Sequence, residues 1–286
     1  MDRTINGNTE LFGIAGHPVS HSLSPVMHNS AFQFMKINAV YVPFHIKNTE
    51  KYLISSLKDI GIKGLSVTIP HKVWACECAD TKDKLSEICG ASNTLVFKNE
   101  KIHAFNTDGP GALRALKTKI KNLSKKKVLL LGYGGSAAAI AHSFFTENTK
   151  IASIHISGRN EEKIDSFIQK LKDMHVSDTV ISGSKTLPDP ESIDIIINTT
   201  PSGMTGKDIA MPIPESYLLA SHTVFDIVYT PRETPLIRAA KIQNATIVYG
   251  YLMLLHQAVL QFHLFTGAEA PVDVMESALL NVLDNC

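Results

Sequence analysis

A lysine and an aspartate stand in separate short motifs of this sequence, and each is an ionisable residue of a type that can take part in proton transfer. Lys72 ends the segment SVTIPHK, and Asp108 stands in NTDG. Taken alone, Lys72 also fits an ordinary surface charge and Asp108 a helix N-cap. The two motifs therefore mark candidates whose role depends on the rest of the sequence.

Hydroxyl side chains stand near these candidates. Serines alternate in SHSLSP, and Ser22 and Ser24 have hydroxyls two positions apart just before a proline that can start a helix. Such hydroxyls could bind a carboxylate, but their spacing alone favours simple N-capping by one serine. Thr68 precedes Lys72 at the carboxyl end of an expected strand, where open α/β sheets place their ligands. The spacing of these residues alone does not decide between a ligand site and local capping.

A glycine-rich loop, GYGGS, joins an apolar run at residues 128–131 to an alanine-rich helical segment. Gly132, Gly134 and Gly135 would let the backbone approach a pyrophosphate, and the helix that starts near Ser136 would offer oriented N–H groups. The spacing is G-x-G-G and lacks the third glycine of G-x-G-x-x-G, so a tight turn without a ligand remains an alternative. The loop predicts a dinucleotide site.

The end of the following strand indicates which dinucleotide. An NAD-binding protein usually has an acidic residue there for the ribose 2′-hydroxyl, but this sequence has SGRNEEK. Arg159 and Lys163 could instead bind a 2′-phosphate through charge-assisted hydrogen bonds. If both were plain surface charges, this preference would disappear. The motif favours NADP.

Short apolar runs alternate with helical periodicity over nearly the whole length, which predicts an α/β protein with parallel sheets. We expect helix N-caps at Ser24 and Asn48. Two helices at the carboxyl end have no strand after them, so we expect them to pack on an earlier domain. The expected strands lie at residues 11–16, 39–44, 64–69, 93–97, 102–105, 128–131, 151–157, 193–198, 223–227 and 246–248. The expected helices lie at residues 25–35, 49–59, 109–119, 251–265 and 272–283, with a further helix after the glycine loop.

Composition excludes several classes of protein. The 286 residues suggest about two domains, and the formal net charge of +1 offers no basic surplus for nucleic acid. Apolar runs are too short to span a membrane, and the amino terminus has no export signal. The four cysteines form no C-x-x-C pair, and no histidine or cysteine spacing indicates a metal site. We expect a cytoplasmic protein without a dedicated metal.

Taken together, the motifs resemble the shikimate dehydrogenase family. SHSLSP is similar to that family's S-x-S-P, SVTIPHK to N-V-T-x-P-x-K, CGASNT to G-A-x-N-T and GYGGS to the GAGGA loop, while NTDG matches unchanged. GRNEEK resembles the N-R-T-x-x-[KR] phosphate clamp, and NTTPSGM, FDIVYTPRETP and GYLMLLHQ complete the series. The motifs follow one another in family order over nearly the whole chain, which makes the resemblance specific.

The resemblance implies reversible NADP-dependent reduction of 3-dehydroshikimate to shikimate, with a small molecule as partner and a monomer or homodimer as the working form. It implies an α/β substrate domain at residues 1–108 plus 250–286, and a Rossmann-like NADP domain at residues 109–249, with the carboxyl-terminal helices returning to the substrate domain. Lys72 and Asp108 would be the catalytic pair, because an ammonium group beside a carboxylate can hold a substrate hydroxyl and exchange its proton. The implied substrate-binding residues are Ser22, Ser24, Thr68, Asn93, Tyr229 and Gln257. The implied cofactor-binding residues are Gly132, Gly134, Gly135, Ser136, Arg159, Lys163, Thr200, Gly250 and Met253.

Several residues depart from the family pattern. Ser66 replaces an asparagine, Gly158 replaces the asparagine of the clamp, Ala138 replaces an arginine, and Tyr133 replaces a small residue of the glycine loop. The changes at 138 and 158 remove hydrogen bonds to the adenosine phosphate. A quinate or dual shikimate/quinate dehydrogenase therefore remains an alternative, as does a catalytically silent nucleotide-binding paralogue. A folate-type methylene dehydrogenase would leave SHSLSP and NTDG unexplained.

Overall fold

The computed structural model describes residues 5–50, 52–175, 178–206 and 210–285. The chain forms two compact units, Met1–Thr107 with Gln257–Cys286, and Asp108–His256. Each unit contains its own six-stranded sheet. Position 51 of the expected helix at 49–59 and the thiol of Cys286 lie outside the described residues.

The sheet of the first unit is mixed, in the order β2-β1-β3-β5-β6-β4. Strand β1 pairs in parallel with β2 and β3, whereas β3 pairs antiparallel with β5, and β5 antiparallel with β6. The carboxyl ends of β1, β3 and β6 therefore meet the amino end of β5 at one edge. The strands are β1 (Glu10–Gly16), β2 (Ala39–His45), β3 (Ile62–Val67), β4 (Thr81–Lys82), β5 (Thr94–Lys98) and β6 (Lys101–Phe105).

The hairpin between β5 and β6 turns through two residues, Asn99 and Glu100, both with positive φ (52° and 60°). A two-residue turn with two positive φ values matches the twist of antiparallel strands. The helices of this unit include α1 (Ser24–Phe34), α2 (Leu53–Asp59), α3 (Lys72–Glu77), α4 (Lys84–Cys89) and α10 (Val272–Leu283).

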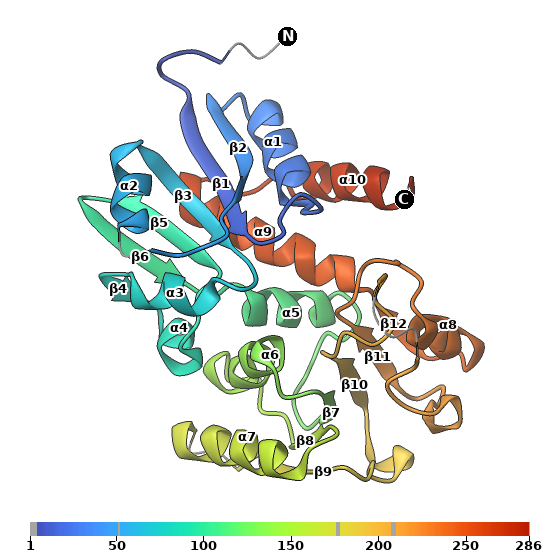
Figure 1. Cartoon of the computed structure of the whole chain (residues 1–286). Coiled ribbons are helices and arrows are strands. Elements are labelled where there is room, and N and C mark those ends of the chain that lie inside the picture. Colours follow the sequence, from blue (N-terminus) through green and yellow to red (C-terminus); the bar gives the residue numbers. More distant parts are fainter. Residues whose placement is uncertain (1–4, 51, 176–177, 207–209, 286) are drawn as a thin grey trace. The chain divides into compact units, whose positions relative to one another are not determined.

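Aromatic side chains join the two ends of the chain in the core of the first unit. The Phe12 ring lies 5.4 Å from both Phe32 and Phe265, and Phe32 lies 5.4 Å from Phe262. Helix α10 packs beside α1, as Figure 1 shows. The carboxyl-terminal helices thus return to the amino-terminal sheet, as the sequence predicts.

The second unit has a parallel sheet in the order β12-β11-β10-β7-β8-β9. Chain order runs outward from β7 in both directions, which is the doubly wound arrangement that binds dinucleotides where the direction reverses. The strands are β7 (Lys127–Leu131), β8 (Ser153–Ser157), β9 (Val180–Ser184), β10 (Ile195–Asn198), β11 (Thr223–Asp226) and β12 (Thr246–Val248).

Helices flank this parallel sheet. They are α5 (Asp108–Lys117), α6 (Gly135–Thr146), α7 (Glu161–Met174) and α8 (Pro235–Ile242), with 3₁₀ turns η1 (Pro190–Ser192) and η2 (Glu215–Tyr217). Helix α9 (Gly250–Thr266) begins in the second unit and ends in the first. Among the described residues, no helix combines the length and apolarity needed to cross a membrane.

Two expected helix caps are wrong. Leu23 stands at the N-cap of α1, and Ser24 is already helical. Asn48 does not cap α2, which begins at Leu53 after Tyr52. Both positions carry a good capping residue, but the helix begins where tertiary packing places it, since capping contributes only about 1 kcal/mol.

Candidate active site

The amino-terminal serine motif lies in the loop after β1. Ser24 is 3% exposed and its N–H faces the Ser22 hydroxyl oxygen at 3.3 Å. Thr68 follows β3, and its N–H donates to Ala15 at the end of β1 (2.9 Å). The predicted serine residues therefore follow the end of β1, and the predicted threonine follows the end of β3. These two strands are parallel neighbours, so both segments leave the sheet at the same edge.

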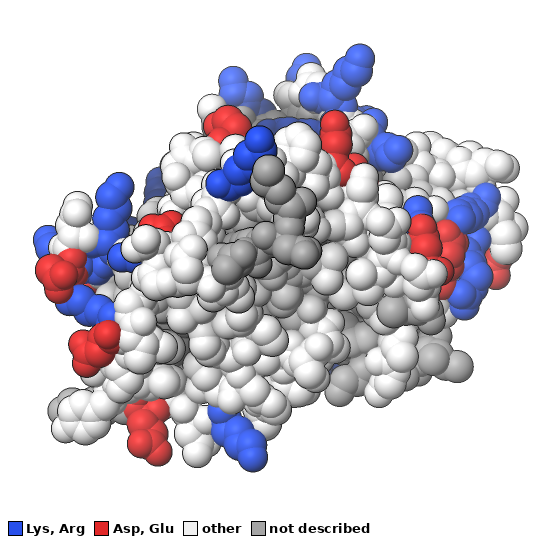
Figure 2. Space-filling view, turned by 90° about the horizontal axis from the view of Figure 1, so that it is seen from above, with Lys and Arg blue, Asp and Glu red and all other residues white. Residues whose placement is uncertain are grey.

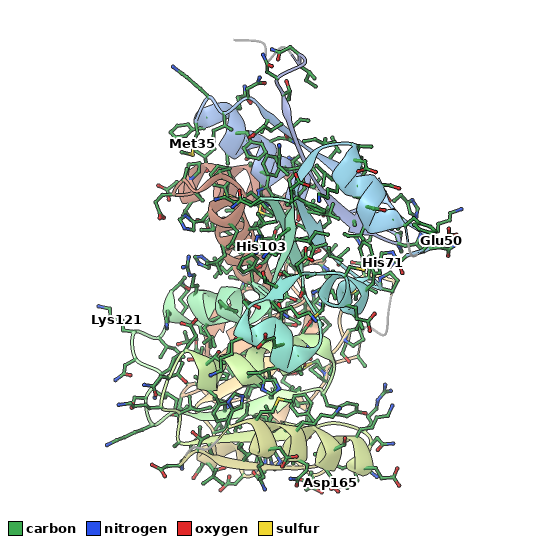
Figure 3. All side chains as sticks on the ribbon, turned by 90° about the vertical axis from the view of Figure 1, so that its left-hand side faces the viewer. Met35, Glu50, His71, His103, Lys121 and Asp165 are labelled. Atoms are coloured by element: carbon green, nitrogen blue, oxygen red, sulfur yellow. The ribbon has the colours of Figure 1, made fainter. Side chains whose placement is uncertain are left out.

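Lys72 is the first residue of the short helix α3. The preceding residue, His71, labelled in Figure 3, is 4% exposed and has its Nε2 at 2.7 Å from the carbonyl of Ile46. The Lys72 carbonyl accepts a hydrogen bond from the Ser92 N–H (2.9 Å). The backbone at Lys72 is thus tied to the segments that follow β2 and precede β5.

Asn93 fixes the segment that leads to Asp108. Its Oδ1 accepts from the Thr107 N–H (2.9 Å), and its Nδ2 donates to the Thr107 hydroxyl (3.0 Å). Asn93 is 2% exposed. Asp108, the next residue, starts α5 and the second unit. The predicted substrate residue Asn93 therefore also orients the backbone just before the predicted catalytic carboxylate.

A glutamine that sequence reasoning missed completes this edge. Gln261 is 1% exposed; its Oε1 accepts from Ser66 (2.8 Å), and its Nε2 donates to Thr94 (3.0 Å). Ser66, the residue that departs from the family pattern, therefore uses its hydroxyl in a hydrogen bond to Gln261. Gln257 lies one turn earlier on α9, on the same helix face as Gln261. In the sequence, the only sign that Gln261 belongs to this edge is its spacing of four residues from Gln257.

One buried histidine near this edge is unsuited to proton transfer. The His28 ring stacks on Tyr41 with centroids 4.4 Å apart. Complete burial lowers the pKa of His28 to about 3, because the charged form would be desolvated. His28 is therefore neutral at physiological pH and belongs to the core.

The glycine loop of the second unit fits a dinucleotide phosphate. Gly132 has a φ of +107°, which favours glycine, and a Cβ added at Gly134 or Gly135 would meet no atom within 4 Å. Helix α6 starts at this point, and its N-cap, Gly134, has no side-chain hydrogen bond to the first turn. Open space and N–H groups without a side-chain cap are what a bound phosphate requires.

Strand β8 brings the basic residues next to this loop. β7 and β8 pair with Leu131 opposite Ser157, and the Gly132 N–H donates to the Ser157 carbonyl (2.8 Å). Arg159 and Lys163 follow and are both exposed. The Asn160 side chain caps α7 by accepting from the Lys163 N–H (3.0 Å). Two cations therefore lie where the second strand ends, beside the place expected for an adenosine ribose.

A buried carboxylate, also missed from the sequence, joins the loops after β10 and β11. Asp226 is 0% exposed; its Oδ1 accepts from Asn198 (2.9 Å) and the Val228 N–H (3.1 Å), and its Oδ2 accepts from Thr234 (2.6 Å). Asn198 in turn accepts from the Thr200 hydroxyl (2.7 Å). Burial raises the pKa of Asp226 to about 6, against the hydrogen bonds, which lower it. We call Thr200, Asn198, Asp226 and Thr234 the Asp226 network.

The other predicted residues of the second unit lie in segments that follow the carboxyl ends of β7, β11 and β12. Tyr229 follows β11 and is half-buried, and burial raises its pKa. Gly250 starts α9, where a Cβ would lie 2.5 Å from the carbonyl oxygen of Val228, so the backbone passes too close for a side chain. Met253, on the next turn of α9, is 9% exposed. Ser136 lies in the first turn of α6.

Basic, acidic and metal-ligating side chains are scattered among the described residues. On the face in Figure 2, basic and acidic side chains are interspersed around the molecule. Within the described ranges, no group of three or more histidine, cysteine, aspartate or glutamate side chains is arranged to hold a metal ion.

Comparison with known proteins identifies the family. Residues 14–95 match the model of the shikimate dehydrogenase substrate binding domain, residues 114–233 that of shikimate / quinate 5-dehydrogenase, and residues 250–280 that of the shikimate 5′-dehydrogenase C-terminal domain. A shikimate dehydrogenase (NADP(+)) of Leptospira interrogans is 42% identical, over 93% of this chain and 92% of that protein.

Solved structures agree with this assignment. A crystal structure of a shikimate dehydrogenase in complex with NADP+ is 35% identical, covers 98% of both chains and has a TM-score of 0.90. A quinate dehydrogenase from Corynebacterium glutamicum in complex with NAD is 25% identical, with a TM-score of 0.86 over 96% of this chain and 99% of that one. The motifs, the two sheets and these similarities together place the chain in the shikimate dehydrogenase family.

Proposed function

We propose that this protein catalyses the reversible NADP-dependent oxidation of shikimate to 3-dehydroshikimate. The observation that carries the proposal is the shared edge of the first sheet, where the segments bearing Ser22, Thr68, Lys72 and Asn93 meet. Hydroxyl, amide and ammonium groups at one edge suit a small acid with several hydroxyls. We assign the substrate to residues 1–108 plus 250–286 and the cofactor to residues 109–249. The two compact units support this division, although Asp108 and residues 250–256 cluster with the second unit.

NADP, when bound, supplies or accepts the hydride. In our proposal Ser22 and Ser24 bind the substrate carboxylate, and Thr68, Asn93 and Gln257 bind ring hydroxyls, with Tyr229 also in contact with the substrate. Oxidation of a secondary alcohol releases one proton besides the hydride. We assign that proton to Lys72, with Asp108 holding the same hydroxyl.

The cofactor set is proposed on the same basis. Gly132, Gly134, Gly135 and Ser136 would bind the pyrophosphate through the open loop and the start of α6. Arg159 and Lys163 would bind the 2′-phosphate, and Thr200, Gly250 and Met253 would contact the nicotinamide half. We place the enzyme in the cytoplasm as a monomer or homodimer, which subcellular fractionation and size-exclusion chromatography with light scattering would test.

A second function, quinate oxidation with NAD, is favoured by one observation, the similarity to the quinate dehydrogenase. The test is an initial-rate matrix of shikimate and quinate against NADP and NAD. We expect kcat/KM to be highest for shikimate with NADP. Replacing shikimate by quinate, or NADP by NAD, should lower it by at least about tenfold. A higher value for quinate with NAD would establish the second function. Cofactor binding without turnover of either acid would indicate a binding-only paralogue.

A further inference from the structure

Two of the departures from the family pattern are in direct contact. A Cβ added at Gly158 would lie 2.5 Å from Cε1 and 2.9 Å from Cδ1 of the Tyr133 ring. Both distances are too short for real atoms, so the Tyr133 ring occupies the space that a side chain at position 158 would need. The backbone itself does not demand glycine, because Gly158 has no positive φ. The large residue at 133 and the missing side chain at 158 are thus one structural feature.

The position of this ring follows from the sheet. β7 and β8 are neighbouring parallel strands that end in register at Leu131 and Ser157. Tyr133 and Gly158 follow these ends, and Arg159 comes next in the chain. In doubly wound folds the adenosine ribose lies beside the end of this second strand. The Tyr133 ring packs against Gly158, yet the residue is only half-buried. It therefore retains surface at the place expected for the adenosine.

We propose that Tyr133 is a cofactor-binding residue that packs against the adenosine moiety shared by NADP and NAD, in the space that Gly158 leaves open. This inference rests on the proposed dinucleotide site. An aromatic ring gives a large contact area with few rotatable bonds, and it does not distinguish a 2′-phosphate from a 2′-hydroxyl. Tyr133 would strengthen binding of both dinucleotides, while Arg159 would discriminate between them.

The first test is calorimetric titration of the full-length protein and its variants with oxidised NADP and with NAD. Tyr133→Ala should raise both dissociation constants by a similar factor of about ten, the size expected for a lost base–aromatic contact. Tyr133→Phe, which keeps the ring, should bind like the parent. Arg159→Asp should weaken NADP far more than NAD. Tyr52→Ala, at an exposed tyrosine of the first unit, is the matched control.

The second test asks whether the two positions act together. Gly158→Ala should displace the ring and weaken both dinucleotides, because its Cβ enters the space of the ring without adding a hydrogen-bonding group. It should add little to Tyr133→Ala, where the space is free. The inference is overturned if Tyr133→Ala leaves both dissociation constants within about twofold of the parent, if it weakens NADP alone, or if the two substitutions act additively. A parent protein that binds neither dinucleotide would instead overturn the proposed function, and this inference with it.

Discussion

Lys72 is positioned through its backbone rather than by its place in a long helix. Its carbonyl is bound by Ser92, and the residue before it is held by the contact of His71 with Ile46. These bonds come from two different segments and fix where the ammonium-bearing side chain starts. A general acid–base group is effective only when its position is fixed in this way.

Replacement of Lys72 by alanine should therefore impair the chemical step. We expect kcat for shikimate oxidation to fall by about 10²–10⁴-fold, with a smaller change in KM, because the proton would lose its acceptor. Lys63→Ala, at an exposed lysine of β3 in the same sheet, is the control and should keep the parent rate. A Lys72→Ala kcat within about twofold of the parent would remove Lys72 from the mechanism.

At the scale of the elements, the Asp226 network holds two loops of the second unit together. One carboxylate joins Asn198 at the end of β10 to Val228 and Thr234 after β11. A buried ionised group is costly, and the raised pKa of Asp226 reports that cost. The network therefore fixes loop geometry at the expense of stability.

Asp226→Asn should stabilise the protein at neutral and higher pH. Because the pKa of Asp226 is raised from 3.8 to about 6, the folded state binds a proton in this window that the unfolded state has lost. The contribution of Asp226 to the free energy of unfolding then falls as pH rises through the window and is constant above it. Asparagine keeps one acceptor oxygen for Asn198 and Val228, and its amide can donate to the Thr234 hydroxyl, which reverses that one hydrogen bond. Because the buried charge is removed, we expect a gain of up to about 3 kcal/mol at about pH 8 and little at about pH 4.

Urea unfolding followed by circular dichroism at both pH values measures this effect. Asp165→Asn is the control, since Asp165 is exposed on α7, where Figure 3 labels it. If Asp226→Asn were less stable than the parent at both pH values, the network would depend on the negative charge itself.

The sequence predicts the longer elements and little of their contacts. Apolar runs such as β7 and β10 were located within about two residues, because buried parallel strands are continuously hydrophobic. Helices α3 and α4 and strand β4 were missed, since two to six residues carry no usable period.

For the candidate site, too, the sequence predicts residues in local motifs but not the contacts between distant segments. Motifs located Lys72, Asn93 and the glycine loop, because each stands in a short local pattern. Asp226 and Thr234 were only part of a quoted motif, and Asn198 lies 28 residues before Asp226, so no spacing rule could pair them. Tyr133 and Gly158 were each noted as departures, but only the pairing of β7 with β8 brings them into contact.

At the scale of the whole molecule, the first unit is built from two distant stretches of chain. Leu279 on α10 is fully buried, and α10 packs on α1. Leu279→Ala should lower the free energy of unfolding by about 2–5 kcal/mol, because it leaves a cavity where a fully buried side chain was packed. Ser277→Ala, at an exposed position of the same helix, should change it by less than about 0.5 kcal/mol.

Denaturant unfolding of both variants tests this, and equal midpoints would show that α10 contributes little to the first unit. NADP binding, which we assign to the second unit, should survive Leu279→Ala under conditions where the protein is folded.

The discontinuous first unit also sets an order of events during synthesis. Phe262 and Phe265, which contact Phe32 and Phe12, leave the ribosome only after the whole of Asp108–His256. The second unit is continuous and can fold as soon as it emerges, whereas the first 107 residues must wait with an incomplete core. During that interval the apolar surface around Phe12 and Phe32 is exposed, so translation speed through the middle of the message and access to chaperones should govern the yield of native protein.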